Sequence, residues 1–201
     1  MIIYEDKDLV VCLKPKGVLS QIGKEGQKNM IDMLSSECGC EIYPVHRLDK
    51  EVSGIMVYAK TKASAANLSN QVSSREMEKH YIATTEKSIL DCEGVMEDLL
   101  YFDKAKNKSF VVKKERKGVK KAILEYKEIS SDENTTSFYV RLLTGRTHQI
   151  RVQFASRKHP LIGDRKYGSK LNCDIGLVSC FISFSHPKTK EVMEFMHPDY
   201  K

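Results

Sequence analysis

Short apolar runs bounded by turn residues recur along the chain and predict β-strands. The runs lie at Leu9–Leu13, Ile55–Ala59, His80–Thr84, Phe110–Lys113, Ala122–Ile129 and Thr136–Leu143. In the last run Phe138, Val140 and Leu142 alternate with Tyr139 and Arg141. Such alternation is typical of a strand that buries one face and exposes the other.

Apolar residues at helical spacing predict two helices among these strands. Ala65, Leu68 and Val72 fall on one face of a helix over Lys62–Arg75. A second helix fits Thr147–Arg157, with Thr147 as its N-cap after a turn at Gly145. Because strands cluster with few helices between them, the predicted fold class is α+β, with a mixed, mostly antiparallel central sheet flanked by helices. No internal repeat or linker divides the chain, so we expect one domain over residues 1–201.

Composition narrows the class of protein. The chain has 201 residues, of which 41% are hydrophobic and 30% charged, as in soluble globular proteins. No apolar run approaches the roughly 18 residues of a membrane span, and the acidic start "MIIYEDKD" does not resemble a signal peptide. We therefore expect a cytoplasmic protein with no membrane contact.

Cysteines and glycine patterns argue against metal and nucleotide cofactors. The six cysteines are Cys12, Cys38, Cys40, Cys92, Cys173 and Cys180. Only Cys38 and Cys40 are close in sequence, and no second pair answers them, so reduced thiols are expected rather than disulfides or a zinc site. The glycine-rich fingerprints of dinucleotide and P-loop sites do not occur. We expect no cofactor.

The formal net charge of +6 is concentrated in one segment. From Asp103 to Lys121, "DKAKNKSFVVKKERKGVKK" holds nine Lys or Arg against two acids, a local charge of +7. Such a run is either a plain solvated surface or an electrostatic footprint for RNA or DNA phosphates. In the second interpretation, the binding residues would be Lys113, Lys114, Arg116 and Lys117.

Three clusters of polar residues could carry chemistry. They are "HRLD" at residues 46–49, "KHYIA" at 79–83 and "TGRTHQIRVQFA" at 144–155. Taken singly, Asp49 fits a turn or salt bridge and Tyr81 a sheet aromatic, while His46 and His148 fit structural hydrogen bonds. Arg151 lies on the second predicted helix, where burial would require a carboxylate partner, and Asp49 is the candidate.

The order of these clusters resembles the RluA-type pseudouridine synthases. The similar segments are "DLVVCLKPKGVLS", "HRLDKEVSG", "KHYIA", "GRTHQIRVQFASRKHPLIGDRKYG" and "FSHPKTKEVMEF", from about Tyr4 to Pro198. The resemblance implies that Asp49 is the catalytic nucleophile or base and that Tyr81 stacks on the target base and moves its proton. It also implies that Arg151 pairs with the catalytic carboxylate and that Arg47 helps displace the flipped nucleotide. The partner would be ribosomal or transfer RNA, and no cofactor would be needed.

The chain departs from that family pattern at several positions. Val52 replaces the usual threonine of "HRLDxxTSG", Gln153 replaces a histidine, and Val178-Ser179-Cys180 stands where "LHA" is common. These departures leave Asp49, Tyr81 and Arg151 in place but put substrate positioning in doubt. We expect no N-terminal S4 domain, the RNA-binding domain of many relatives. We expect the basic segment to supply RNA affinity in its place.

Two other classes of function remain as alternatives. An RNA-binding module that kept the fold without turnover would be favoured by a substitution at Asp49, which the chain does not have. A glycosidase would need a second carboxylate in a comparable motif, and none accompanies Asp49. A protein without any RNA role is a further alternative. A monomer is the default expectation.

Overall fold

A computed structural model describes residues 1–86 and 90–200 of the chain. Over these residues the fold is a mixed, mostly antiparallel β-sheet structure with three α-helices, so the predicted fold class is confirmed. The residues group into two units, one formed by residues 1–79 and 178–201 and the other by residues 80–177. None of the helices in the described ranges is long and apolar enough to cross a lipid bilayer.

The first unit is built from strands at both ends of the chain. Its strands are β1 (Ile2–Glu5), β2 (Leu9–Lys14), β3 (Tyr43–Pro44), β4 (Ser53–Ala59), β10 (Leu177–Ser185) and β11 (Val192–Met196). Their order is β1-β2-β4-β10, with β3 also on β4 and β11 also on β10. The β4–β10 pair is parallel, and the other pairs described in this unit are antiparallel.

Gly54 allows β4 and β10 to approach each other. It lies opposite Ser179 in the parallel pair and has φ +121°. A Cβ atom at this position would lie 2.2 Å from the main-chain oxygen of Ser179. Any side chain here would therefore push β10 away, and its backbone conformation favours glycine as well.

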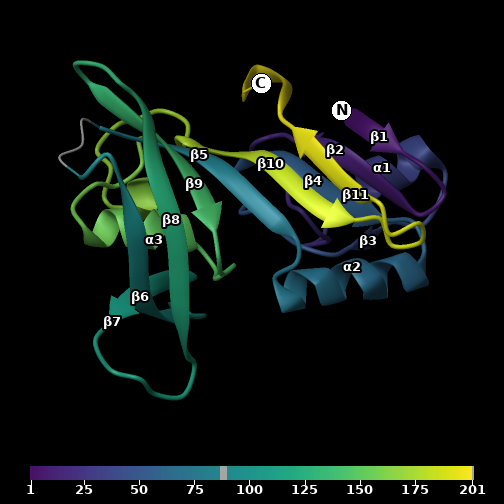
Figure 1. Ribbon diagram of the computed structural model, residues 1–201, viewed down its shortest axis with the longest axis horizontal. Helices are drawn as coiled ribbons and strands as arrows, with labels where there is room; N and C mark the ends of the chain where they lie inside the picture. Colours follow the sequence, from purple (N-terminus) through teal and green to yellow (C-terminus); the bar gives the residue numbers. More distant parts are fainter. Residues whose placement is uncertain (87–89, 201) are drawn as a thin grey trace. The chain divides into compact units, whose positions relative to one another are not determined.

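Two helices complete the first unit. Helix α1 (Met30–Cys38) begins at Asn29, whose side chain accepts a hydrogen bond from the Asp32 amide. Helix α2 (Lys62–Ser74) is capped by Thr61 and packs on β3 and β4 (Figure 1). Its Leu68 joins a buried apolar cluster with members from both ends of the chain: Leu9, Val11, Ile55, Val57, Ala59, Met77, Ile182 and Phe184.

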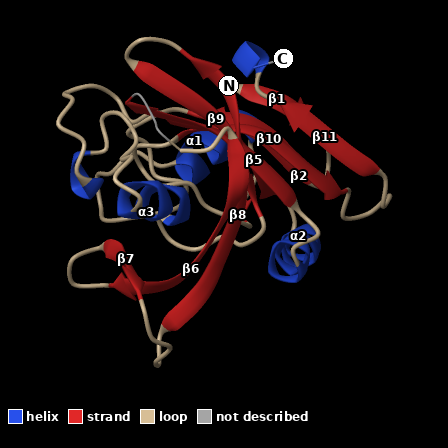
Figure 2. Cartoon of the chain, turned by 60° about the vertical axis from the view of Figure 1, so that its left-hand side comes forward, coloured by secondary structure: helices blue, strands red, loops and turns tan. Residues whose placement is uncertain are grey.

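The second unit is an antiparallel sheet with one helix. Its strands are β5 (Glu78–Glu86), β6 (Glu93–Asp103), β7 (Lys108–Val112), β8 (Val119–Ser131) and β9 (Thr135–Leu142), in the order β5-β9-β8-β6-β7. Helix α3 (Gln149–Ser156) packs on β6 and β7 (Figure 2). In β9, Phe138 and Val140 are buried while Arg141 is exposed, as the alternation predicted.

Each predicted strand and helix corresponds to an observed element, but several observed elements were not predicted. Strands β1, β3, β6, β10 and β11 and helix α1 were not predicted. The N-cap at Thr147 was wrong, because α3 begins after His148, which has a left-handed backbone conformation (φ 54°). The Gln149 side chain instead reaches back to accept hydrogen bonds from the Arg146 amide and the Thr144 hydroxyl.

Candidate active site

The loop that carries Asp49 runs between β3 and β4 in the first unit. Its centre is held by Ser20, whose hydroxyl donates to the Leu48 carbonyl at 2.7 Å and accepts from the Leu48 amide at 2.9 Å. The Asp49 carbonyl accepts the Val52 amide and closes a turn. Leu48 is buried, Asp49 is half-buried and Arg47 is exposed. The backbone on the N-terminal side of Asp49 is therefore fixed, while the flanking arginine points to solvent.

A buried lysine fastens a second loop to this one. Lys14, at the end of β2, donates to the carbonyls of Pro15, Val18 and Lys50 at 2.9, 2.7 and 3.1 Å. Burial lowers the pKa of Lys14 to about 8, against the raising effect of the Glu51 and Asp49 charges. Lys14 is the first residue of the "KPKG" sequence, which by itself predicts no role for it. It is a positive charge placed near Asp49.

His46 is a structural residue of the same loop. Its Nε2 accepts the Val57 amide at 3.1 Å, so the ring proton lies on Nδ1. Among the described residues, no partner meets that Nδ1 atom. Burial lowers the pKa of His46 to about 3, with the charge of Lys79 acting in the same direction. The imidazole is therefore neutral at physiological pH and joins the loop to β4.

The other two residues expected at a catalytic centre lie in the second unit. Tyr81 is buried in β5, opposite Val140 of β9. Arg151 lies on α3 and is also buried. The α3 face that carries Arg151 is surrounded by buried neighbours, which explains why the guanidinium requires a carboxylate partner.

One carboxylate partner of Arg151 is Asp164, which no sequence motif indicated. Arg151 Nε donates to Asp164 Oδ2 at 2.7 Å, and Nη2 donates to Oδ1 at 2.8 Å. The two side chains are only 7% and 1% exposed. This is a bidentate, buried ion pair that fixes the plane and direction of the guanidinium. The pairing of Arg151 with Asp49 stays a prediction.

An aromatic residue lies against the same arginine. The guanidinium carbon of Arg151 is 5.2 Å from the centre of the Tyr167 ring. The Tyr167 hydroxyl accepts the Ser109 amide at 2.8 Å and lies 2.9 Å from His148 Nδ1. Burial raises the pKa of Tyr167 to about 12, so the phenol is neutral. Arg151 is thus held by a carboxylate and by a ring that is itself anchored to β7.

The basic segment consists of strand β7, the turns on either side of it and the start of β8. Lys113, Lys114, Arg116 and Lys117 lie between β7 and β8, and all four are exposed. The Arg116 guanidinium carbon lies 4.8 Å from the centre of the Tyr101 ring. The four cations are therefore accessible from solution. Both a plain solvated surface and a binding site for RNA phosphates require this accessibility.

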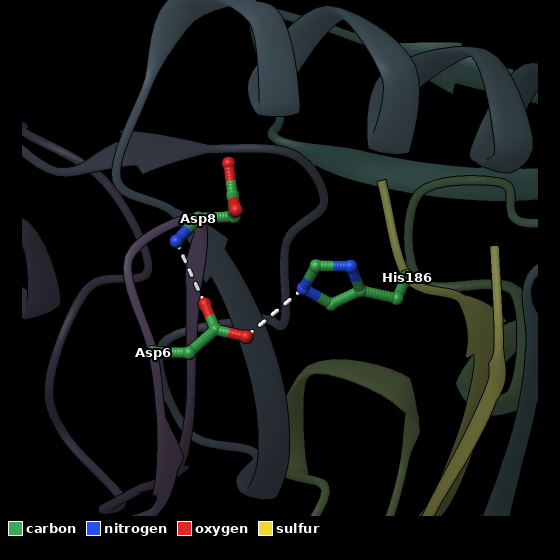
Figure 3. A group of neighbouring side chains, drawn as sticks. All are labelled: Asp6, Asp8 and His186. Atoms are coloured by element: carbon green, nitrogen blue, oxygen red, sulfur yellow. Dashed lines mark hydrogen bonds and ion pairs between the residues drawn. The ribbon is translucent and has the colours of Figure 1, made fainter. Parts of the chain in front are cut away.

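One group of side chains has the composition of a metal site: Asp6, Asp8 and His186 (Figure 3). Asp6 and His186 already have protein partners, and Asp8 Oδ1 accepts the Ser64 hydroxyl at 3.1 Å. His186 donates from Nε2 to Asp6 Oδ2 at 2.9 Å, while its Nδ1 accepts the amides of Lys188 and Thr189. Burial alone would raise the pKa of Asp6, but the amides of Asp8 and Leu9 lower it below its usual value. These contacts tie the β1–β2 turn to the β10–β11 turn.

Comparison with known proteins places these motifs in a family. Residues 8–156 match the family model described as RNA pseudouridylate synthase. The chain belongs to this family. It is 32% identical over 203 residues to an uncharacterized RNA pseudouridine synthase of Mycoplasma genitalium, covering 98% of this chain and 66% of that protein. It is also 32% identical to the dual-specificity RNA pseudouridine synthase RluA of Salmonella typhimurium, covering 98% of this chain and 92% of the relative.

Solved structures agree with the fold of this chain. Human RNA Pseudouridylate Synthase Domain Containing 1 superposes with a TM-score of 0.80 at 21% identity, over 98% of this chain and 82% of that one. The chain spans about two thirds of the length of the Mycoplasma relative. The family-model match and the sequence identity confirm the predicted family. The roles of individual residues stay predictions.

The departures from the family pattern have structural explanations. Val52 is buried, where its methyl groups need no polar partner. Ser179 donates to the Ile55 carbonyl at 3.1 Å and so supports the β4–β10 pair. Gln153 is completely buried and donates from Nε2 to the Met96 carbonyl and to Asp98. Its Oε1 has no hydrogen-bond partner among the described residues. Ser179 and Gln153 thus each join two elements within a unit, and Val52 fills apolar space.

Proposed function

We propose that this protein is an RNA pseudouridine synthase that isomerises uridines in ribosomal or transfer RNA. The family match over residues 8–156 carries the proposal, because that span includes Asp49, Tyr81 and Arg151. We further propose that the protein works as a cytoplasmic monomer. Its chemistry needs no electron transfer, because one carbon–nitrogen bond is exchanged for one carbon–carbon bond in the same nucleotide.

The isomerisation must break the bond between N1 of uracil and C1′ of the ribose. The base then turns and rejoins C1′ through C5, after which C5 loses its proton and N1 gains one. Asp49 acts first, as a nucleophile or base on the ribose or the ring. A cation beside the carboxylate orients it through charge-assisted hydrogen bonds. In this proposal Arg151 supplies the cation from α3, and Lys14 adds positive charge near Asp49.

Tyr81 and Arg47 act on the displaced base. Extrusion of a base from an RNA stack costs a few kcal/mol, so an aromatic ring that receives it and a cation that fills its place are both useful. Tyr81 stacks on the uracil and takes the proton from C5. Arg47, which is exposed beside Asp49, occupies the vacated position in the RNA.

Asp164 is a positioning residue in this scheme. The bidentate pair at 2.7 and 2.8 Å fixes the direction in which Arg151 presents its remaining N–H groups. Catalytic groups that are held in place before substrate arrives cost no reorganisation during the reaction. Asp164 therefore acts through Arg151 and does not touch the RNA.

The test is a comparison of pseudouridine formation with and without Asp49. RNA from cells that lack the gene is incubated with the purified parent or with Asp49→Asn, and pseudouridines are mapped. The parent should restore specific sites, while Asp49→Asn should bind RNA equally well and restore none. Near-parent conversion by Asp49→Asn would refute the catalytic assignment. RNA binding by the parent without conversion would favour the alternative, a binding module that lost turnover.

A further inference from the structure

The ribbon formed by β6, β7 and β8 has one buried face and one open face. Leu100 and Ser109 are buried on the inner face, where Leu100 packs with Val152 and Tyr167 and the Ser109 amide donates to the Tyr167 hydroxyl. Because side chains alternate along a strand, Tyr101 and Phe110 lie on the opposite face. They are direct partners across β6 and β7, and both are half-buried. Two aromatic rings thus stand side by side on the open face.

Each ring is accompanied by cations of the basic segment. The Arg116 guanidinium carbon lies 4.8 Å from the centre of the Tyr101 ring. Lys106 and Lys108 place their Nζ atoms 5.7 and 5.8 Å from the centre of the Phe110 ring. The segment from residue 103 to 121 that supplies these cations carries a local charge of +7.

A plain solvated surface does not account for these two aromatic residues. The solvent face of an antiparallel sheet is usually polar, since apolar rings gain nothing by facing water. A cluster of solvated lysines does not need aromatic rings beside it either. Aromatic faces interleaved with Lys and Arg are the composition of sites that stack unpaired bases and neutralise their phosphates.

We propose that Tyr101 and Phe110 form a stacking platform for unpaired bases of the substrate RNA. This inference rests on the proposed function, which makes RNA the ligand. It specifies that unpaired bases are the part of the RNA that binds this surface. The cations over the rings do not block it. An exposed cation–π contact changes an equilibrium constant by a factor of about 2–5, whereas one base stacked on an aromatic side chain contributes a factor of about 5–150. An arriving base therefore displaces Arg116 or Lys106, which then meets the phosphates. Lys108 stays in place, because its Nζ donates to the Lys166 carbonyl and lies 4.9 Å from the centre of the Tyr167 ring.

The platform is tested by removing the rings while keeping the charges. The variant Tyr101→Leu/Phe110→Leu keeps apolar bulk, and Tyr200→Leu is the matched control because Tyr200 is exposed elsewhere in the chain. The probes are a labelled oligouridine of about 12 nucleotides, within the usual size of single-strand sites, and an RNA of equal length whose ribose units lack bases. The double variant should bind oligouridine about tenfold or more weakly and bind the abasic RNA like the parent. Tyr200→Leu should match the parent on both probes.

The outcomes separate this inference from the proposed function. Parent-like binding of oligouridine by the double variant would overturn the platform, and so would an equal loss on both probes. If thermal unfolding shows that the double variant is not folded, the single variants Tyr101→Leu and Phe110→Leu are measured against the same two criteria. Conversion of uridine by the parent is assayed in parallel on RNA from cells without the gene. Ring-dependent oligouridine binding without any conversion would refute the proposed function and leave the platform standing.

Discussion

Replacing Asp164 by asparagine tests the buried pair with Arg151 most directly. Asparagine has nearly the same size but one acceptor oxygen, so its amide group would face an N–H group of Arg151. The guanidinium keeps its charge at any accessible pH, and its partner carboxylate is 1% exposed. Removing one member of a buried ion pair costs about 3–5 kcal/mol. Against a total stability of about 5–15 kcal/mol, this is a large loss.

The expected readings are a lower melting temperature and slower turnover. For a chain of this length, about 1 kcal/mol corresponds to about 2–4 °C, so Asp164→Asn should melt at least about 6 °C below the parent. A displacement of about 1 Å in a catalytic group can cost about a hundredfold in rate, and single-turnover conversion of a target RNA should fall by about that factor. The control is Glu97→Gln, which breaks the exposed pair with Lys121 at 2.6 Å and should change stability by less than about 1 kcal/mol.

A double variant separates stability from positioning. Arg151→Met/Asp164→Leu removes both charges, and buried ion pairs replaced by apolar residues often lose little stability. This variant should recover most of the melting temperature but not the activity. If Asp164→Asn melts and turns over like the parent, the ion pair contributes neither stability nor positioning, and the role given to Asp164 is wrong.

Three further predictions follow from the other parts of the site. Tyr81→Phe should keep RNA affinity and lose about 10² or more in single-turnover rate, because it retains the ring and removes the general base; parent-like turnover would move the proton to another group. If about five cations of the basic segment meet phosphates, RNA binding should weaken about 10²–10³-fold between about 50 and 200 mM salt. Neutralising Lys113, Lys114, Arg116 and Lys117 should flatten that dependence, and an unchanged slope would make the segment plain surface. Since the pKa of His46 is about 3 in the folded protein and 6.5 ordinarily, the unfolded chain takes up the proton first as pH falls below 6.5. The free energy of unfolding, measured in urea, should thus fall by about 2 kcal/mol from pH 7 to 5. The fall should be smaller in His46→Gln, and an equal fall in both proteins would contradict this account.

The elements that sequence patterns predicted are those with uninterrupted local signals. Helix α2 was predicted because Ala65, Leu68 and Val72 keep helical spacing along an uninterrupted segment. Strand β6 was missed because acids interrupt its apolar residues, as in "EGVMEDLLYFD". Strand β10 was missed because small polar residues alternate with its buried ones in "LVSCFISFS". Local pattern fails where burial depends on neighbours that are distant in sequence.

The same limit applies to the site. The clusters that hold Asp49, Tyr81 and Arg151 were recognised from contiguous motifs, and the need for a carboxylate near Arg151 followed from burial alone. The identity of Asp164 as a partner could not be predicted, since it lies 13 positions after Arg151 and beyond the end of α3. The left-handed conformation of His148 was equally hidden, because non-glycine residues with positive φ are uncommon and carry no reliable local signal.

The parallel pairing of β4 with β10 has a consequence for biosynthesis. Residues 60 to 176 must be made after β4 is complete and before β10 begins. At a synthesis rate of about 5–20 residues per second, this interval lasts roughly 6–23 s. During that time the edge of β4 at Gly54 waits for its partner, while the sequence of the second unit already emerges as an uninterrupted segment. The nascent second unit can therefore fold first, and a premature stop before residue 178 would leave the Asp49 loop on a sheet without its neighbouring strand.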